Sequence, residues 1–458
     1  MYRLKQITIF LGDMICMLVG LLFAIAVRHW QIPSENLLKL IAPMSVLFIV
    51  AALIMFIAGL YDVDRNKNSK KFFNKIIITS AVWILLGVIF FYVRPYKDVT
   101  PKTILLLNAF FGFGIISLWR FFYNKLFSTI IWRQNIVFAG ISNEVKELIA
   151  MIKENPQCGY KVKGLLIDET TPRDESLSNI IMGTSINEIT SLTLQKPNII
   201  VLTPAMEGKE MLLKELYSGL FKQINVMSLA QFYEEVLGRI PPFTFSEGWF
   251  ISNLQEQKKR IYDRAKLIID YSSALLMAVF FLITFPFIAL AIKINSRGPI
   301  FFRQQRVGLL GKNFFLYKFR TMKALNPDGS AETNGPCFAS QADRRITRIG
   351  KFLRLTRLDE IPQFINILRA EMSIIGPRPE RPEFVDQTKQ RMPYYSLRHL
   401  IKPGLTGWAQ IKHGYSGNID ENLRKLEYDL YYLKNRGPML DLAIILRTIN
   451  IVAKLGGR

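Results

Sequence analysis

Four apolar runs in the first third of the chain constrain its fold most strongly. They cover residues 6–27, 37–60, 76–93 and 103–119, and each is about long enough to cross a bilayer as a helix. Because lipid offers no hydrogen-bond partner to a peptide group, segments of this kind must satisfy their own backbone as helices. The sequence therefore predicts a four-helix transmembrane bundle over residues 1–125.

Cations between the apolar runs predict the orientation of this bundle. They cluster between the second and third runs and after the fourth, at Arg65, Lys67, Lys70, Lys71 and Lys75, then Arg120, Lys125 and Arg133. By the positive-inside rule both ends of the bundle face the cytoplasm, although the remaining loops also carry cations. Asp13 lies inside the first run near its amino end, and we expect its side chain to reach the membrane interface.

The region 130–250 has the pattern of a Rossmann-like α/β domain. Buried strands are expected near 135–139, 162–167, 198–203 and 224–228. Helical segments separate them, beginning with 144–153, so the pattern predicts a parallel sheet. Gly140 is the only glycine in the first turn, and the G-x-G-x-x-G of dinucleotide sites is missing. A structural or regulatory domain is therefore favoured over a dinucleotide site.

A fifth apolar run lies within residues 266–292 and contains Pro286. Cations stand on both sides of it, at Lys258, Lys259, Arg260, Arg264 and Lys266 before, and at Lys293, Arg297, Arg303 and Arg306 after. Both flanks thus prefer the cytoplasm, which a crossing helix cannot satisfy. Proline removes a backbone hydrogen bond and bends a helix, so we expect a re-entrant helix hinged at Pro286. The alternative is an ordinary fifth crossing.

The net charge of the 458-residue chain is +23, which requires an anionic partner. Nucleic acid, lipid headgroups and phosphorylated substrates would each serve. The membrane segments favour the lipid bilayer and a phosphorylated substrate, with no nucleic acid. The three histidines are too scattered for a zinc motif, so any metal is expected to be bound by oxygen.

Asp359 and Glu360 form an acid pair at the junction of two helical segments. Cations recur every third residue before the pair, at Arg345, Arg348, Lys351, Arg354 and Arg357, and apolar residues follow it with helical spacing, at Ile361, Phe364, Ile365 and Leu368. Asp359 could be a helix N-cap, or the pair could act on a phosphate held by the cations. Arg354 and Arg357 are candidates for phosphate contact, with a solvated helix face as the alternative.

Two further stretches carry candidate phosphate ligands. In the segment Gly376-Pro377-Arg378-Pro379, prolines stiffen both sides of one arginine, as expected of a guanidinium that is pre-set for bidentate phosphate binding. Lys318 and Arg320 alternate along a strand-like segment, which predicts that both lie on one face. They could hold a diphosphate or a lipid phosphate, or they could rest on anionic headgroups.

Five motifs in the last third together resemble one family. They are Gly298-Pro-Ile-Phe-Phe-Arg303-Gln-Gln-Arg306-Val-Gly308, Tyr317-Lys318-Phe-Arg320-Thr-Met322, Arg357-Leu-Asp359-Glu360-Ile-Pro362-Gln363, Met372-Ser-Ile-Ile-Gly376-Pro377-Arg378-Pro379 and Lys402-Pro-Gly404-Leu-Thr406-Gly407-Trp408-Ala-Gln410. In this order, after a proline-containing apolar run, they resemble the bacterial sugar transferases that are polyprenyl-phosphate glycosyl-1-phosphate transferases. The bundle and the α/β region resemble the layout of the long members of the exopolysaccharide-priming undecaprenyl-phosphate glucose/galactose phosphotransferase type.

The resemblance implies a reaction and its residues. The family moves a sugar 1-phosphate from a UDP-sugar donor to undecaprenyl phosphate, through a covalent phosphosugar-aspartyl intermediate, and so primes exopolysaccharide or O-antigen-type glycans. By this resemblance Asp359 is the nucleophile and Glu360 its partner, either as a ligand of Mg²⁺ with Asp359 or as a proton handler. Lys318, Arg320, Arg354, Arg357, Pro377 and Arg378 are then expected to bind substrate.

The expected protein is a multidomain α plus α/β membrane protein with a mostly α catalytic domain over residues 255–458. We expect a multi-pass protein of the bacterial inner membrane whose catalytic domain is cytoplasmic; its oligomeric state is open, a homo-oligomer included. Two other functions remain as alternatives. One is a membrane nucleotide-sugar dehydratase or epimerase that uses the middle domain, against which the missing glycine loop argues. The other is a non-catalytic membrane scaffold or sensor.

Overall fold

The computed structural model describes residues 2–29, 34–62, 67–93, 101–127, 133–167, 181–183, 198–210, 212, 214, 216–217, 224–242, 247–254, 259–326, 343, 345–413 and 419–453. Contacts divide the chain into two units, Met1–Leu237 and Gly238–Arg458. The elements of the first unit are α1 (Tyr2–His29), α2 (Ser34–Ile57), α3 (Lys70–Val93), α4 (Pro101–Phe127), β1 (Gln134–Ala139), α5 (Asn143–Glu154), the 3₁₀ helix η2 (Pro156–Cys158), β2 (Tyr160–Leu166), β3 (Ile181–Gly183), β4 (Ile199–Leu202), α7 (Pro204–Glu207), β5 (Asn225–Ser228) and α9 (Leu229–Leu237).

The second unit covers Gly238–Arg458. Its elements are α10 (Glu247–Asn253), α11 (Arg260–Asn295), β6 (Phe301–Val307), η7 (Leu309–Gly311), β7 (Asn313–Phe319), α12 (Arg348–Leu355), η8 (Leu358–Gln363), α13 (Phe364–Leu368), β8 (Ser373–Ile375), α14 (Pro382–Arg391), η9 (Pro393–Leu400), β9 (Gly404–Thr406), α15 (Trp408–Lys412), α16 (Ile419–Asn435) and α17 (Pro438–Ala453).

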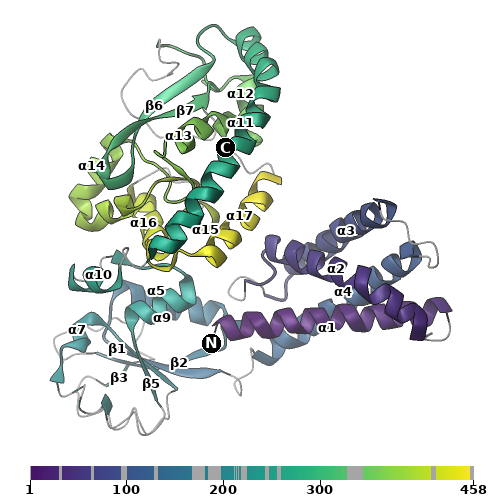
Figure 1. The fold of residues 1–458 in the computed structure, drawn as a ribbon. Coiled ribbons are helices and arrows are strands. Elements are labelled where there is room, and N and C mark those ends of the chain that lie inside the picture. Colours follow the sequence, from purple (N-terminus) through teal and green to yellow (C-terminus); the bar gives the residue numbers. More distant parts are fainter. Residues whose placement is uncertain are drawn as a thin grey trace. The chain divides into compact units, whose positions relative to one another are not determined.

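The four apolar runs of the first third form helices α1 to α4. Helix α1 packs along α4, and α3 packs against α2 and α4 (Figure 1). Within the described residues, these four helices and α11 are long and apolar enough to cross a membrane. Trp83 is fully buried between helices and donates its indole N–H to the Leu47 carbonyl at 2.7 Å, which satisfies the one polar group of that side chain.

The prediction that the Asp13 side chain reaches the membrane interface is wrong. The side chain does not reach outward but is 0% exposed, and the Arg120 guanidinium donates to both of its oxygens at 2.6 and 3.0 Å. Arg120 belongs to α4 rather than to the loop that was expected to orient the bundle, and it also donates to the Leu60 carbonyl. A bidentate partner on another helix makes burial of the carboxylate tolerable, and the pattern of a single helix does not reveal such a partner.

The middle of the chain forms the predicted parallel sheet. Its strand order is β3-β2-β1-β4-β5, and all four pairings are parallel. Helices α5 and α9 bury apolar faces against the sheet. The short strand β3 was not predicted, since its three residues carry too little periodicity. This order is that of the first five strands of the Rossmann sheet, 3-2-1-4-5.

Gly140 ends β1 with a positive φ of 96°. A Cβ atom there would lie 1.9 Å from Thr203 Oγ1, and Thr203 donates to the Ala139 carbonyl at 3.0 Å. The glycine therefore permits both a left-handed backbone and the close approach of the residue that follows β4. The close packing of Thr203 is therefore enough to explain why residue 140 is a glycine.

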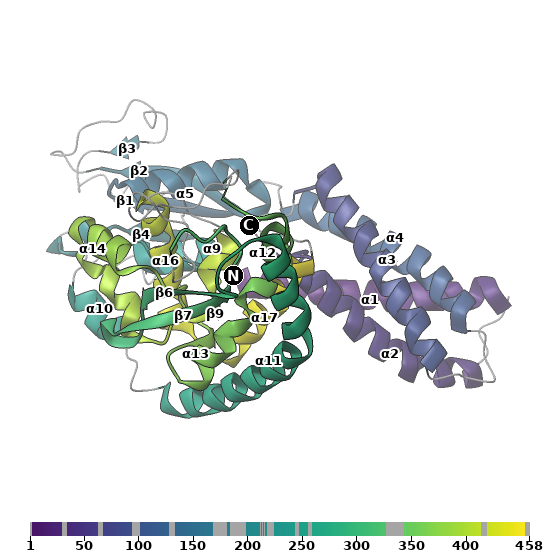
Figure 2. The same ribbon diagram turned by 90° about the horizontal axis from the view of Figure 1, so that it is seen from above.

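Helix α11 runs without interruption from Arg260 to Asn295 through Pro286, and it follows a curved path (Figure 2). Thr284 donates to the Phe280 carbonyl one turn back, rather than to the Leu282 carbonyl that Pro286 leaves without its helical partner. Next to the proline, five phenylalanine rings with neighbouring centroids 5.1 to 5.8 Å apart join α11 to β6, β7 and α13: Phe281, Phe285, Phe301, Phe319 and Phe364. The aromatic cluster fixes this part of α11 against α13, the helix that directly follows η8 and its acid pair.

Candidate active site

A break in the helical backbone separates the arginine-rich helix from the acid pair. Thr347 caps α12, since its hydroxyl accepts from the Gly350 N–H at 2.9 Å. Arg357 then adopts a left-handed conformation with φ 59°, and the chain restarts as the 3₁₀ helix η8, with Asp359 and Glu360 in its first turn. Arg357, not Asp359, occupies the cap position, so the cap interpretation of Asp359 is wrong. The predicted junction of two helical segments at the acid pair is confirmed.

The apolar face that was predicted after the acid pair is only partly correct. Ile361 is buried, but Leu368 is 43% exposed, and Ile367 takes its place in the core. The prediction assumed one α-helix of 3.6 residues per turn from Ile361 onward. In the structure six residues of 3₁₀ helix come first and shift the phase of the face.

Glu360 is the centre of a cluster of cations. Its Oε1 atom lies 2.8 Å from Lys318 Nζ, 2.9 Å from Arg378 Nη2 and 3.6 Å from Arg357 Nη1. Burial alone would raise the pKa of this carboxyl, but these three cations together hold it well below its usual range. Glu360 is therefore ionised and its Oε1 atom is occupied by protein donors.

Asp359 lies next to Glu360 in a different environment. It is 7% exposed, and its Oδ1 atom is buried without a hydrogen-bond partner among the described residues. Burial raises the pKa of Asp359 to about 6, and the Glu360 charge adds to this, while Lys318 is the strongest influence that lowers it. At neutral pH the group is thus an ionised, desolvated carboxylate with an oxygen free to react.

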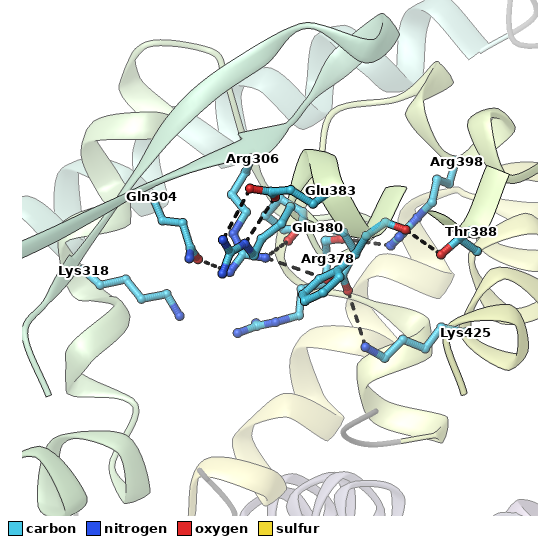
Figure 3. Close-up of polar contacts among 12 residues, drawn as sticks. Gln304, Arg306, Lys318, Arg378, Glu380, Glu383, Thr388, Arg398 and Lys425 are labelled. Carbon is cyan, nitrogen blue, oxygen red and sulfur yellow. Dashed lines mark hydrogen bonds and ion pairs between the residues drawn. The ribbon is translucent and has the colours of Figure 1, made fainter. Parts of the chain in front are cut away.

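Lys318 and Arg378 approach the acid pair from two separate segments. Lys318 comes from β7 and Arg378 from the loop after β8, and the two side chains point toward one another (Figure 3). Burial lowers the pKa of Lys318, which the Glu360 carboxylate opposes. With Arg354 and Arg357, these residues place four cations around two carboxylates, so the site retains positive charge for an incoming anion.

Arg354 and Arg357 both lie on the approach to the acid pair. Arg354 donates from Nε to Thr321 Oγ1 at 2.8 Å, and its charge acts on Asp359. Arg357 is one-third exposed, so most of its donors remain available. The structure therefore brings together six of the predicted charged residues: Lys318, Arg354, Arg357, Asp359, Glu360 and Arg378.

Arg320 does not join this group. Its side chain is 2% exposed, and its guanidinium donates to the carbonyls of Ser296, at 2.7 Å, and Arg297, which end helix α11. Gly298 makes room for it, since a Cβ atom there would lie 2.1 Å from Arg320 Nη1. In place of the predicted phosphate contact, Arg320 satisfies free carbonyls at a helix C-terminus, where a cation is favourable. Strand alternation gave no sign of this, because β7 ends at Phe319.

The loop that carries Arg378 is fixed through Pro377 and its neighbours. The Pro377 carbonyl accepts from the Gly404 N–H at 2.8 Å, and Gly376 donates to the Thr406 carbonyl at 2.9 Å. A Cβ atom on Gly376 would lie 2.4 Å from the Lys402 carbonyl oxygen, so only glycine allows this approach. Pro377 is thus placed for support of Arg378 rather than for direct contact with an anion.

Sequence reasoning missed a second group of charged residues beneath this loop. It contains Arg306, Glu380, Arg398, Lys425 and Asp429, most of which are shown in Figure 3. Arg398 and Asp429 are each 2% exposed and lie 2.8 Å apart. Arg306 and Glu380 stood within or beside the quoted motifs, whereas Arg398 and Asp429 are visible only through their pairing in space. Burial raises the pKa of Asp429 to about 6.

A divalent cation would find one suitable ligand here. The described residues contain no group of three or more His, Cys, Asp or Glu side chains that could hold a metal. Mg²⁺ usually takes one or two carboxylates and completes its shell with water and substrate phosphates. The unpartnered Oδ1 of Asp359 fits that pattern, whereas the Oε1 of Glu360 already faces three cations.

The raised pKa of Asp359 predicts a stability effect. The carboxyl has a pKa of about 6 in the folded chain, and about 3.9 is usual when unfolded, so ionisation disfavours the folded state above pH 6. Asp359→Asn removes that penalty and should raise the free energy of unfolding by about 2 kcal/mol at pH 7.5. The gain should shrink toward pH 4.5, where the folded wild-type carboxyl is protonated. Thermal unfolding in detergent at both pH values measures it, and a loss of stability at pH 7.5 would contradict it.

Comparison with known proteins gives a consistent result. A model of the family described as "Bacterial sugar transferase" matches residues 261–455. The chain is similar to a UDP-N-acetylgalactosamine-undecaprenyl-phosphate N-acetylgalactosaminephosphotransferase of Aeromonas hydrophila, with 39% identity over 50% of this chain and 52% of that protein. The match therefore spans about half the length of that relative.

Two other relatives match in different ways. A UDP-glucose:undecaprenyl-phosphate glucose-1-phosphate transferase of Klebsiella pneumoniae is 29% identical over 88% of each chain. The exopolysaccharide production protein PSS of Rhizobium leguminosarum bv. phaseoli is 36% identical over 42% of this chain and 92% of its own length. The similarity to these two relatives thus covers 88% and 42% of this chain.

Proposed function

Because the chain belongs to the bacterial sugar transferase family, we propose that it moves a sugar 1-phosphate from a UDP-sugar to undecaprenyl phosphate and so primes a glycan of the exopolysaccharide or O-antigen type. The relatives from Aeromonas hydrophila and Klebsiella pneumoniae are named as transferases that act on a UDP-sugar and undecaprenyl phosphate, which supports this donor and this acceptor. The single observation that carries the proposal within this chain is the buried oxygen of Asp359, which has no hydrogen-bond partner among the described residues and is under the influence of Lys318, Arg354 and Arg357.

In the proposed first step Asp359 is the nucleophile. One carboxylate oxygen attacks the phosphorus that carries the sugar, and the bond from this phosphorus to the bridging pyrophosphate oxygen breaks. Uridine monophosphate leaves with that electron pair, and the sugar phosphate remains as an acyl phosphate on Asp359. A carboxylate that has already lost its water and makes no competing hydrogen bond is suited to this attack.

In the second step a phosphate oxygen of undecaprenyl phosphate attacks the same phosphorus. The bond to the Asp359 oxygen breaks, the carboxylate is restored and the lipid diphosphate sugar is released. No proton needs to be taken up or lost by Asp359 in this cycle. The two substrates therefore occupy the same centre in turn.

The cations around the pair neutralise the charge of the pyrophosphate. Lys318, Arg357 and Arg378 are held together by Glu360, which keeps three mutually repelling cations near one phosphate. Glu360 thereby acts as an anchor for these side chains rather than as a nucleophile. Fixed cations at the position of developing charge are the usual means of stabilising phosphoryl transfer.

Asp359 would hold Mg²⁺ through one oxygen of its carboxylate while the other attacks, and the ion would supply further charge neutralisation there. Glu360 is the less suitable of the two predicted metal ligands, because its Oε1 atom is engaged by Lys318, Arg378 and Arg357. The rest of the charge neutralisation in both transfer steps comes from Lys318, Arg357 and Arg378.

We place the catalytic domain, residues 255–458, on the cytoplasmic side of the bacterial inner membrane, in a chain that also contains the bundle 1–125 and the α/β domain 130–250. The cationic flanks of α11, its curvature and its interior Pro286 support a re-entrant helix. Such a helix would hold the acid pair near the headgroups, where the acceptor phosphate lies. Cysteine-scanning across 261–295 with an impermeant thiol reagent tests this, and labelling of its two ends from opposite sides would refute it.

The pKa of Asp359 predicts the pH dependence of the first step. The rate constant kcat/KM for the donor should rise with pH through a midpoint of about 6, because only the ionised carboxylate attacks. Lys318→Met should move this midpoint to higher pH, since Lys318 is the strongest influence that lowers the pKa of Asp359. Asp429 also titrates near 6, but the groups that act on it do not include Lys318. An unchanged or lower midpoint in Lys318→Met would contradict the assignment.

Release of nucleoside monophosphate from candidate donors tests the function itself. Purified protein in detergent is mixed with a panel of UDP-sugars, undecaprenyl phosphate and Mg²⁺. The proposal predicts uridine monophosphate and a lipid-linked sugar diphosphate from at least one donor. Release of uridine diphosphate, or conversion of the sugar without transfer to lipid, would contradict it and would favour a different enzyme class.

A further inference from the structure

The loop of Arg378 has an unusual way of being held in place. Prolines at 377 and 379 remove two backbone N–H donors, so this loop is fastened mainly through its carbonyls. The four consecutive carbonyls from Pro377 to Glu380 each accept a hydrogen bond. Their donors are, in order, the Gly404 N–H at 2.8 Å, Arg398 Nη2 at 2.8 Å, Arg306 Nη1 at 3.2 Å and the Val307 N–H at 2.9 Å.

The outer two donors are backbone groups, whereas the inner two are arginine side chains. Each of these arginines lies next to its own buried carboxylate: Arg398 is 2.8 Å from Asp429, and Arg306 is 3.7 Å from Glu380. Arg398 is the better fixed, because both it and Asp429 are 2% exposed. It also donates to the Tyr395 hydroxyl at 2.5 Å, with its guanidinium 5.1 Å from the centre of that ring.

A chain of contacts therefore leads from α16 to the acid pair. Asp429 pairs with the Arg398 guanidinium, Arg398 holds the carbonyl of Arg378, and the Arg378 side chain reaches Glu360 Oε1 at 2.9 Å. Figure 3 shows Arg398 on the side of this loop opposite Lys318. Arg398 Nη2 contacts both Asp429 Oδ2 and the Arg378 carbonyl, and Arg398 Nη1 donates to the Tyr395 hydroxyl. A planar guanidinium holds these three partners in one fixed geometry, which a lysine cannot reproduce with its single nitrogen.

We propose that Arg398 and Asp429 are positioning residues, which set the direction of Arg378 by fixing its backbone carbonyl. This inference rests on the proposed function, because the part of Arg378 that they direct is the one assigned to the donor phosphate. A displacement of about 1 Å at a group that orients a reacting phosphate is enough to lower a rate by up to about 100-fold. Neither residue needs to touch substrate.

A double-mutant cycle separates positioning from general support of the fold. Arg398→Lys keeps the charge beside Asp429 but should lose the bond to the Arg378 carbonyl, and it should lower kcat/KM about tenfold. In an Arg378→Ala background the same substitution should change kcat/KM less than about twofold, because the side chain that it misdirects is absent. An equal loss in both backgrounds would mean that Arg398 only supports the fold, and would overturn the proposal.

Arg239→Lys is the matched control. Arg239 Nη1 pairs with Glu427 Oε2 at 2.7 Å, on the same helix as Asp429, and this pair lies outside the assigned machinery. The Arg239→Lys substitution should leave kcat/KM unchanged in both the wild-type and the Arg378→Ala background. If Arg398→Lys does not fold, Tyr395→Phe serves instead, since it removes one acceptor from Arg398 and keeps the ring. A full wild-type rate for Tyr395→Phe in that case would also overturn the proposal.

Binding of UDP, measured by calorimetry across the same four proteins, gives a readout without turnover. If wild type binds UDP but transfers no sugar, the proposed function fails while the cycle in UDP affinity still tests the positioning. If Arg398→Lys and Arg378→Ala lower UDP affinity non-additively, the positioning role is supported. If their losses of affinity are additive, the positioning role is overturned. If wild type transfers sugar and the cycle is additive, only the positioning fails. Absence of both transfer and UDP binding would remove both proposals.

Discussion

Asp359→Asn is expected to lower transfer of sugar phosphate to lipid by at least about 10⁴-fold, the scale seen when a covalent nucleophile is removed. Asparagine keeps the size and the position of the side chain but has no anionic oxygen for the attack on phosphorus. The Oδ1 atom of Asp359 makes no hydrogen bond among the described residues, so the substitution breaks no contact there. Uridine monophosphate release and formation of the lipid product measure the loss.

The control for this substitution is its own stability. Because ionised Asp359 disfavours the folded state above pH 6, Asp359→Asn should be at least as stable as wild type at pH 7.5. A variant that is inactive and more stable indicates a group that serves chemistry at the expense of stability. Activity within about 100-fold of wild type would exclude Asp359 as the nucleophile.

Glu360→Gln is expected to lower kcat/KM by about 10² to 10³-fold, because it removes the buried carboxylate that pairs with three partly buried cations. Lys318, Arg357 and Arg378 would then repel one another without a counter-charge and would no longer be held at one phosphate. Because Glu360 serves as their anchor, the loss should not be recovered by raising the Mg²⁺ concentration. Steady-state rates across a Mg²⁺ titration measure this.

Glu383→Gln is a suitable control for Glu360→Gln. Glu383 also pairs with an arginine, Arg381, but its side chain is about half exposed and the pair lies outside the acid cluster. It should retain the wild-type rate. If Glu360→Gln regained activity at high Mg²⁺, Glu360 would be a metal ligand and the anchor role would be incorrect.

Those elements whose pattern is local were predictable from the sequence. The apolar runs became helices α1 to α4, and the buried strands of the middle region formed a parallel sheet, because period and length alone decide these features. A junction of two helical segments at the acid pair was also expected. Its cause, a left-handed Arg357, was not, since nothing in the pattern of an arginine-rich helix marks a single residue with positive φ.

Features that depend on a partner far along the chain were not predictable. Asp13 was assigned to the membrane interface because its partner Arg120 lies 107 residues away. Arg320 was assigned to a phosphate because the free carbonyls at the end of α11 are not visible in the pattern of β7. The pair Arg398 and Asp429 was missed for the same reason: in sequence, each is one charged residue on an amphipathic helix.

The covalent intermediate is the most direct test of the account. Wild-type protein is mixed with its UDP-sugar donor without acceptor, digested and analysed by mass spectrometry. The account predicts one sugar phosphate on the peptide that contains Asp359, lost when undecaprenyl phosphate is added and absent in Asp359→Asn. Uridine monophosphate release that requires the acceptor and leaves no modified peptide, or a modification that persists in Asp359→Asn, would contradict it.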